Sequence, residues 1–368
     1  MRTLYIHIGT GKTGTTALQN FLAKNSSILN NQGYHYITTL QSGNNHHEFC
    51  ANYQRMINKS DNDTFNNLEA LKSEIQNSSF KNFIISSEYF PGNNANDISN
   101  ISSVLSSIVK IKFVLYLRRQ DEYVESWYSQ VVKSGLEEGT IDNLIQILKN
   151  EKYLDYKYLI DTWTSILGEE SAIIRKYQKN MFYGKNIFSD FLHSINIPNS
   201  ESFLTEDKDP NPGLKREQII LGNELLRINP SLSLETLRTP VSFAFKSTNW
   251  LSFDQKVKLL SSYEDTNKYI AARYFSSEEL FTPPVFNDEN EPSDIYSSDF
   301  TLMFLLMHKY QENSDKILSA IADLLAELIE KNVNNNKSLA LKFVSWLSLL
   351  ENQKKYAVNN FIKRILYE

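Results

Sequence analysis

Short apolar runs alternate with longer stretches of helical periodicity along the first half of the chain. Runs rich in β-branched and aromatic residues predict strands at Leu4 to Ile8, Phe83 to Ser86, Phe113 to Leu117 and Ala172 to Arg175. After the first run, apolar residues from Ala17 to Leu22 repeat at helical spacing, with Thr15 or Thr16 placed to cap that helix. Near-continuous apolar strands separated by helices are typical of a buried parallel sheet. The pattern predicts an α/β fold of the P-loop type, with a parallel sheet flanked by helices.

The pattern changes after residue 282. Three prolines among Asn, Asp, Glu and Ser residues indicate a linker at 283–298, and the remaining pattern, 299–368, is helical. We therefore expect an α/β domain at 1–282 and a C-terminal helical appendage. The apolar stretch 339–350 is interpreted as packing within a bundle or at a dimer interface, because few Lys or Arg residues flank it; a peripheral membrane contact is the alternative.

Composition narrows the class of protein. A chain of 368 residues can hold one large domain with an appendage, and a net charge of −5 argues against a non-specific nucleic-acid binder. The single cysteine, Cys50, cannot form an internal disulfide and is interpreted as a small buried side chain. We find no signal-peptide pattern and no apolar stretch of about 18 residues, so we expect a cytoplasmic protein without a transmembrane segment.

The first predicted strand leads into the glycine-rich segment GTGKTGTT, residues 9–16, and then into a helix. Glycines such as Gly11 and Gly14 let backbone N–H groups turn toward an anion, and the helix N-terminus adds its dipole. Lys12 adds a positive charge, and further donors are the hydroxyls of Thr13, Thr15 and Thr16. A nucleoside-triphosphate loop would have Gly where this chain has Ile6. The segment predicts a site for a dianionic group; a turn that only caps the helix is the alternative.

The sequence from His7 to Leu22, HIGTGKTGTTALQNFL, resembles the 5′-phosphosulfate loop of the sulfotransferase superfamily. Many bacterial members have Pro where this chain has Gly11. The resemblance implies that residues 11–16 bind the phosphosulfate of 3′-phosphoadenosine-5′-phosphosulfate (PAPS).

A second candidate anion site follows the third predicted strand. Arg118 at the strand's carboxyl end and Ser126 about two helical turns on can converge on one anion, although a surface Arg and Ser is the default interpretation. The sequence YLRRQDEYVESWYSQ resembles the superfamily block in which an Arg and a Ser at this spacing bind the donor's 3′-phosphate. We assign Arg119 to the surface or to a charge pair with Asp121 or Glu122.

Transfer to a hydroxyl needs a proton acceptor. Glu88 follows a predicted strand, and IISSEYF resembles a bacterial sulfotransferase block in which Glu replaces the His of many animal members. A capping or salt-bridging carboxylate is the alternative. His47 is the second candidate base, although the pair His46–His47 in a loop is more often simply solvated. His7 is expected to pack inside its strand, and the histidines form no convincing metal cluster.

The resemblance implies a PAPS-dependent sulfotransferase. It would move a sulfuryl group to a hydroxyl, or to an amine, of a saccharide or glycolipid acceptor, leaving 3′-phosphoadenosine-5′-phosphate. Lys12 would stabilise the departing phosphate, Glu88 would act as base, and no metal is required. The alternatives are a P-loop kinase-type phosphotransferase, which should carry acidic Mg²⁺ ligands, and a non-catalytic nucleotide-binding protein.

Overall fold

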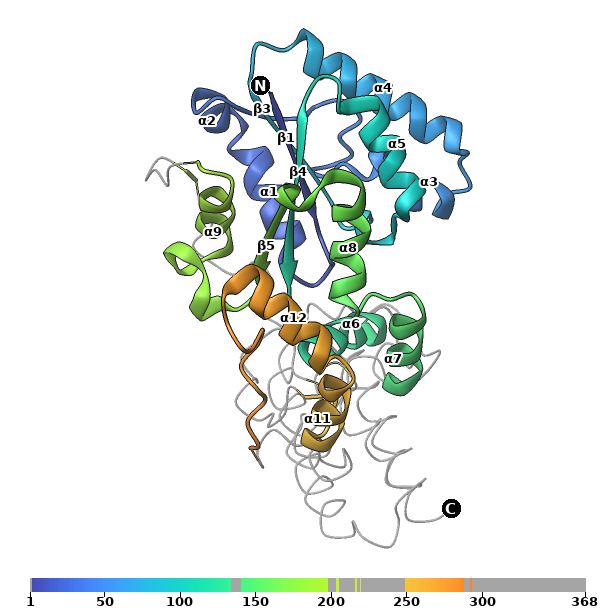
Figure 1. The fold of residues 1–368 in the computed structure, drawn as a ribbon, viewed down its shortest axis with the longest axis vertical. Coiled ribbons are helices and arrows are strands. Elements are labelled where there is room, and N and C mark those ends of the chain that lie inside the picture. Colours follow the sequence, from blue (N-terminus) through green and yellow to red (C-terminus); the bar gives the residue numbers. More distant parts are fainter. Residues whose placement is uncertain are drawn as a thin grey trace, which may run out of the picture. The chain divides into compact units, whose positions relative to one another are not determined.

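The computed structural model describes residues 2–133, 140–197, 203–204, 216, 219, 249–287 and 292. One compact unit comprises Met1–Ser126, Thr140–Asn211 and Lys256–Pro284, and it contains the sheet (Figure 1). A second unit includes the described residues 127–133, 249–255 and 285–287. The predicted appendage, 299–368, and most of the predicted linker lie outside the described residues.

A five-stranded sheet in the order β2-β3-β1-β4-β5 forms the centre of the first unit. The strands are β1 (Thr3–Ile8), β2 (Tyr34–Tyr36), β3 (Asn82–Ser87), β4 (Lys110–Leu117) and β5 (Ala172–Lys176). Every neighbouring pair is parallel, and the last residue of β1, Ile8, lies opposite Ser87 of β3 and Leu115 of β4. The predicted α/β fold with a parallel sheet is confirmed. The short edge strand β2 was not predicted.

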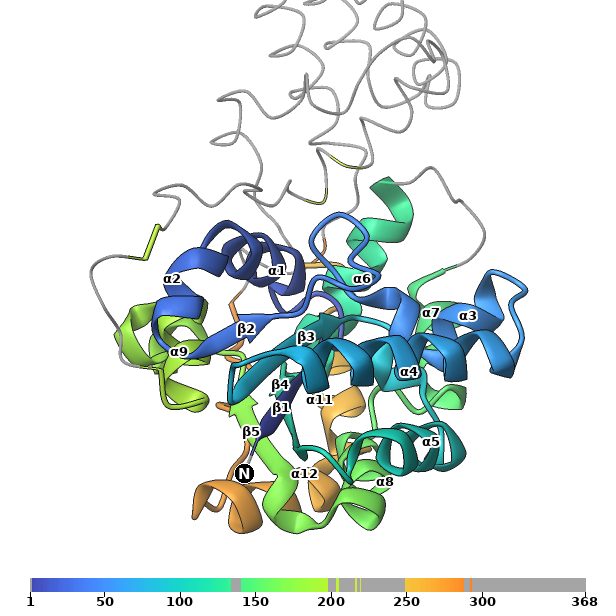
Figure 2. The ribbon, with the colours of Figure 1, turned by 90° about the horizontal axis from the view of Figure 1, so that it is seen from above.

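Helices cover both faces of the sheet. Their bounds are α1 (Thr15–Lys24), α2 (Ser26–Asn31), α3 (Ala51–Met56), α4 (Asp61–Asn77), α5 (Ala95–Leu105), α6 (Gln120–Lys133), α7 (Ile141–Asn150), α8 (Tyr156–Leu167), α9 (Ile187–Ser194), α11 (Phe253–Ser261) and α12 (Glu264–Phe275). Short 3₁₀ turns are η1 (His47–Phe49), η2 (Phe90–Gly92), η3 (Glu169–Ser171), η4 (Lys179–Met181) and η5 (Tyr183–Lys185). Figures 1 and 2 show α1, α2 and α9 on one face of the sheet and α4, α5 and α8 on the other.

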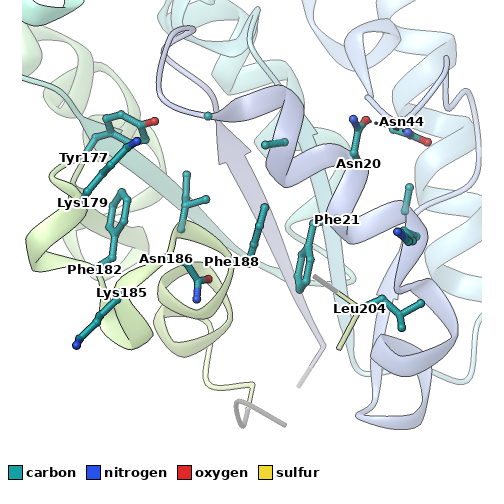
Figure 3. Close-up of a pocket in the computed structure, with 15 residues that line it drawn as sticks. Asn20, Phe21, Asn44, Tyr177, Lys179, Phe182, Lys185, Asn186, Phe188 and Leu204 are labelled. Atoms are coloured by element: carbon teal, nitrogen blue, oxygen red, sulfur yellow. Dashed lines mark hydrogen bonds between the residues drawn. The ribbon is translucent and has the colours of Figure 1, made fainter. Parts of the chain in front are cut away.

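The alternation of side chains along β1 divides the core between these two faces. Tyr5 packs with α1, α2 and α9, where the rings of Phe21 and Phe188 stack at 4.6 Å (Figure 3). Leu4, Ile6 and Ile8 point the other way and pack with α4, α5 and α8.

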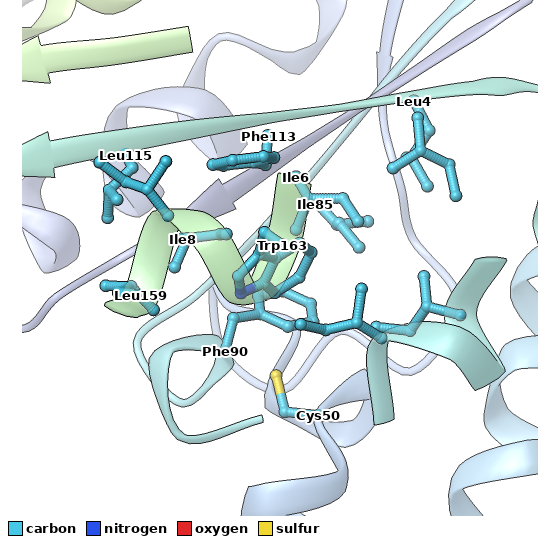
Figure 4. Packing of buried hydrophobic residues seen from close by; sticks show 14 of the residues in the cluster. Leu4, Ile6, Ile8, Cys50, Ile85, Phe90, Phe113, Leu115, Leu159 and Trp163 are labelled. Carbon is cyan, nitrogen blue, oxygen red and sulfur yellow. The ribbon is translucent and has the colours of Figure 1, made fainter. Parts of the chain in front are cut away.

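The second core cluster centres on an indole. Trp163 of α8 is fully buried between Phe90 and Phe113, whose ring centroids lie 5.9 and 5.5 Å away (Figure 4). Cys50 belongs to the same cluster and is fully buried, as predicted. Burial also raises the pKa of the Cys50 thiol, so this cysteine is a packing residue.

The start of α1 differs from the prediction. Its N-cap is Gly14 in the left-handed region, with no side-chain cap, whereas Thr15 and Thr16 are its first two helical residues. The predicted threonine cap is therefore wrong, because a glycine with positive φ makes the turn into the helix. This leaves the hydroxyl of Thr15 available for a contact described below.

Candidate active site

The loop between β1 and α1 has an unusual backbone. Gly11, Lys12 and Gly14 have φ values of 58°, 53° and 73°. This region is easily reached by glycine but strained for lysine, and such strain is concentrated at functional sites. The conformation folds the loop back at the carboxyl edge of β1, where the first N–H groups of α1 have no intrahelical partner. The predicted residues 11–16 thus surround one helix N-terminus, which is a suitable place for an anion.

Glu88 lies beside this loop because β3 and β1 are neighbours. The backbone N–H of Gly9 donates to the carbonyl of Ser87 at 3.0 Å, and Glu88 comes next in the chain. The exposed Glu88 carboxylate accepts a hydrogen bond from the Thr15 hydroxyl, with Oγ1 3.3 Å from Oε2. The structure therefore brings the predicted base into contact with the predicted anion loop.

The other loop hydroxyls have different surroundings. Thr13 is fully buried, and its hydroxyl lies 3.5 Å from that of Thr10. Thr10 also donates to the carbonyl of Tyr116 in β4 at 3.1 Å, which fixes the loop to the next strand. Thr16 is exposed on the first turn of α1.

Arg118 follows β4 and reaches back to the same loop. Its Nη1 donates to the carbonyl oxygen of Lys12 at 2.7 Å, and its guanidinium lies 5.6 Å from the ring centroid of Tyr177. Its Nε is 3.6 Å from a carboxylate oxygen of Glu122. Ser126 is half-buried about two turns into α6. The guanidinium of Arg118 is thus placed at the loop, and its role in binding the 3′-phosphate with Ser126 stays a prediction.

Arg119 is turned to other partners. It forms a double hydrogen bond with Asp121 at 2.7 and 2.9 Å and lies 3.3 Å from Glu122. It also donates to the carbonyl of Thr282 at 2.9 Å. The predicted charge pair of Arg119 with Asp121 or Glu122 is therefore confirmed, and both carboxylates take part.

His47 lies at the start of η1, beside the end of β3. Its Nδ1 is 2.7 Å from the hydroxyl oxygen of the fully buried Ser87, the residue before Glu88. The rings of Tyr89 and Tyr53 lie 4.7 and 5.4 Å from the imidazole. Burial lowers the pKa of His47 to about 4, so this side chain is neutral at pH 7.

The neighbouring histidines are structural. His46 is fully buried, accepts at Nδ1 from the N–H of Ser86 and contacts the carbonyl of Ile37 through Nε2 at 2.8 Å. The interpretation of His46 and His47 as a simply solvated pair is therefore wrong, because His46 is buried and links β3 to the segment that follows β2. His7 is fully buried inside β1, as predicted.

A cavity of ≈ 730 Å³ adjoins the loop (Figure 3). It lies between α1 and the segment 177–188, and it shares Gly14 with the loop. Its lining contains three lysines and no carboxylate, namely Gly14, Ala17, Asn20, Phe21, Ala23, Lys24, Asn44, Tyr177, Lys179, Phe182, Lys185, Asn186, Ile187, Phe188 and Leu204. We did not predict this cavity; the position of Tyr177 just after β5, at the same edge as the loop, was the available signal.

In the part of the chain that the structure describes, no helix is long and apolar enough to cross a membrane. Nor do these residues include a group of three or more His, Cys, Asp or Glu side chains arranged to hold a metal ion.

No protein-family model matches the chain. A protein of Archaeoglobus fulgidus described as uncharacterized is 28% identical over 207 residues, which make up 54% of this chain and 55% of that protein. The chain thus spans about half the length of the curated relative it matches. Among solved structures, a sulfotransferase from Alicyclobacillus acidocaldarius is similar with a TM-score of 0.38 and 10% identity, over 64% of this chain and 96% of that one.

Proposed function

We propose that this protein is a sulfotransferase that moves a sulfuryl group from PAPS to an acceptor hydroxyl. One observation carries the proposal: two hydrogen bonds join three candidate groups at one sheet edge. Arg118 donates to the Lys12 carbonyl at 2.7 Å, and Thr15 of the same loop donates to Glu88 at 3.3 Å. A cation, an anion-binding loop and a carboxylate are the groups that sulfuryl transfer requires.

The same arrangement supports a donor site at this edge of the sheet. The loop 11–16 and the N-terminus of α1 bind the 5′-phosphosulfate, and Arg118 with Ser126 binds the 3′-phosphate. The nucleoside occupies the cavity that meets the loop at Gly14. Its volume of ≈ 730 Å³ is within the range of about 300–1,000 Å³ that is usual for small-molecule sites.

The reaction is an in-line displacement at sulfur. The acceptor oxygen forms a bond to sulfur while the bond from sulfur to the bridging oxygen of the 5′-phosphate breaks. Glu88 takes the proton of the acceptor hydroxyl, and the electron pair of the broken bond stays with 3′-phosphoadenosine-5′-phosphate. Lys12 and the loop N–H groups stabilise the charge on that leaving group.

The acceptor is a saccharide or glycolipid hydroxyl, with an amine as the alternative. Aromatic rings at the proposed base support a sugar, because the apolar face of a sugar ring can pack on them. Tyr53 and Tyr89 lie 4.9 Å apart between centroids, and Tyr89 directly follows Glu88.

The test is calorimetric titration of the purified chain with 3′-phosphoadenosine-5′-phosphate, 5′-AMP and ATP with Mg²⁺. We expect binding that needs the 3′-phosphate and that weakens about 10- to 100-fold in Arg118→Ala, the effect of losing a hydrogen bond to a charged group. Arg273→Ala is the matched control, because Arg273 pairs with Glu169, which precedes the amino end of β5 at the opposite sheet edge.

Two results would contradict the proposal. Binding of ATP with Mg²⁺, and none of the 3′-phosphorylated nucleotide, would favour a kinase-type phosphotransferase. Selective binding of the 3′-phosphorylated nucleotide without turnover on any acceptor, including saccharides, would favour a non-catalytic nucleotide-binding protein.

A further inference from the structure

The hydroxyl of Ser87 connects His47 to the end of β3. Ser87 is fully buried, and its Oγ lies 2.7 Å from Nδ1 of His47. The same oxygen accepts a hydrogen bond from the backbone N–H of Tyr89 at 3.2 Å. Ser87 Oγ thus accepts one hydrogen bond from a backbone N–H. The acceptor of its own hydroxyl proton is the question that follows.

The proton on Ser87 determines the tautomer of His47. A hydroxyl has one proton to donate, and a neutral imidazole has one N–H and one bare nitrogen. If Ser87 donates to Nδ1, the proton of His47 is on Nε2. If Nδ1 carries the proton instead, the Ser87 proton must go to another acceptor.

The surroundings favour the first arrangement. Another acceptor beside Ser87 is the sulfur of Cys50, and thiol sulfur is a weak acceptor compared with an imidazole nitrogen. The stronger acceptor is therefore Nδ1 of His47, 2.7 Å from the hydroxyl oxygen, and this places the Ser87 proton on the bond to His47.

The hydrogen bond of His47 to Ser87 uses Nδ1 and leaves Nε2 for another partner. The imidazole is half-buried, and among the described residues Nε2 of His47 is not one of the buried nitrogens that lack a hydrogen-bond partner. The imidazole contacts the rings of Tyr53 and Tyr89, and Glu88 lies between Ser87 and Tyr89 in the sequence, so two contacts of His47 flank the proposed base along the chain.

We propose that His47 binds the acceptor as a neutral hydrogen-bond donor, presenting Nε2–H to the acceptor oxygen while Glu88 takes that oxygen's proton. The inference rests on the proposed sulfuryl transfer and assigns His47 a positioning role, with Ser87 fixing its tautomer. A lone pair of the acceptor oxygen receives the bond from Nε2–H, so no proton moves through His47.

The first experiment reads the tautomer in the free, full-length chain. Long-range ¹H–¹⁵N correlation of ¹⁵N-histidine-labelled protein at pH 7 distinguishes the two neutral tautomers, and the spectrum of His47→Gln identifies the signals. We expect His47 to be protonated at Nε2, and Ser87→Ala to shift it toward a mixture. An Nδ1–H tautomer in the native chain would overturn the proposal by itself, whatever the chain binds.

The second experiment separates donor from base. His47→Gln keeps an N–H near the position of Nε2 but cannot act as a base, whereas His47→Leu has no polar group. With PAPS and water as the acceptor, we expect release of 3′-phosphoadenosine-5′-phosphate to fall about tenfold in His47→Leu, and we expect the conservative His47→Gln to recover most of that loss. His193→Gln, an exposed histidine on α9, is the control.

The affinity for 3′-phosphoadenosine-5′-phosphate should be the same in all these variants. Equal losses of about 10²- to 10⁴-fold in His47→Gln and His47→Leu would identify His47 as the base and refute the positioning role. Loss of nucleotide binding in the native chain would instead refute the proposed function, and the tautomer result would stand independently of it.

Discussion

Gly9 is packed so closely against the site that one added methyl group there should be measurable. An ideal Cβ at Gly9 would lie 2.4 Å from Cγ2 of Thr15 and 3.3 Å from Cα of Glu88. A real Cβ does not approach another carbon to 2.4 Å, so Gly9→Ala must rotate the Thr15 side chain or push α1 away from β3. Either movement disrupts the hydrogen bond from Thr15 to Glu88.

The expected cost is that of overpacking, about 1–3 kcal/mol in the free energy of unfolding. At about 2–4 °C per kcal/mol for a domain of this size, Tm should fall by roughly 2–12 °C. Thr15→Ser removes the clashing Cγ2 methyl and keeps the hydroxyl. The double variant Gly9→Ala/Thr15→Ser should therefore melt close to Thr15→Ser alone.

Scanning calorimetry of the two single variants and the double variant tests this coupling. Gly33→Ala is the control: its φ of 81° strains any side chain, but no atom lies within 4 Å of the added Cβ. Thr15→Ser should leave the effect of Gly33→Ala unchanged. If Gly9→Ala has the same Tm as the native protein, or if adding Thr15→Ser does not recover the lost Tm, then the close packing of Gly9 against α1 is wrong.

Two further predictions concern stability. Burial lowers the pKa values of His46 and His47 from 6.5 to about 4. Between these pH values the unfolded chain binds protons that the folded chain does not bind, so the free energy of unfolding should decrease as the pH falls from about 6.5 toward 4. The slope is up to about 1.4 kcal/mol per pH unit for His46 and smaller for the partly solvated His47; equal urea midpoints at pH 7 and pH 5 would contradict it. Asp190→Asn weakens a buried pair with Arg175 and should cost about 1.5–3 kcal/mol, read from the urea midpoint. Asp161→Asn, at a half-exposed ion pair with Lys157, should change that midpoint little. Equal shifts in the two variants would show that the cost of Asp190→Asn does not come from the burial of its carboxylate.

The strands that could be predicted are those with continuous apolar sequence. Leu4 to Ile8 and Phe113 to Leu117 lie in the middle of the sheet, so both of their faces are apolar and the pattern is unmistakable. β2, Tyr34–Tyr36, was missed because an edge strand of three residues gives too short a pattern. Its pairing with β3 is a long-range contact that local periodicity does not contain.

The site was predictable where a residue's position on an element fixes its direction. Arg118 and Glu88 both follow strands, and parallel strands bring such residues to one edge. The bond from Thr15 to Glu88 and the burial of His46 depend on which strands are neighbours, which the order of residues along the chain does not determine. The roles of Ser126, Lys12 and Glu88 in catalysis and binding stay predictions.

The hydrogen bond from Arg118 to the Lys12 carbonyl makes the two proposed anion sites a single thermodynamic unit. Under the proposed function, an anion that orders Arg118 also orders the strained turn at Lys12. The coupling is reciprocal, so an anion bound in the loop strengthens anion binding at Arg118 by the same free energy. A donor without its 3′-phosphate would then lose more than one contact, because the loop that must hold the reacting sulfur would be less rigid. Selectivity for the nucleotide would appear in the rate of sulfuryl transfer as well as in affinity, with one arginine responsible for both.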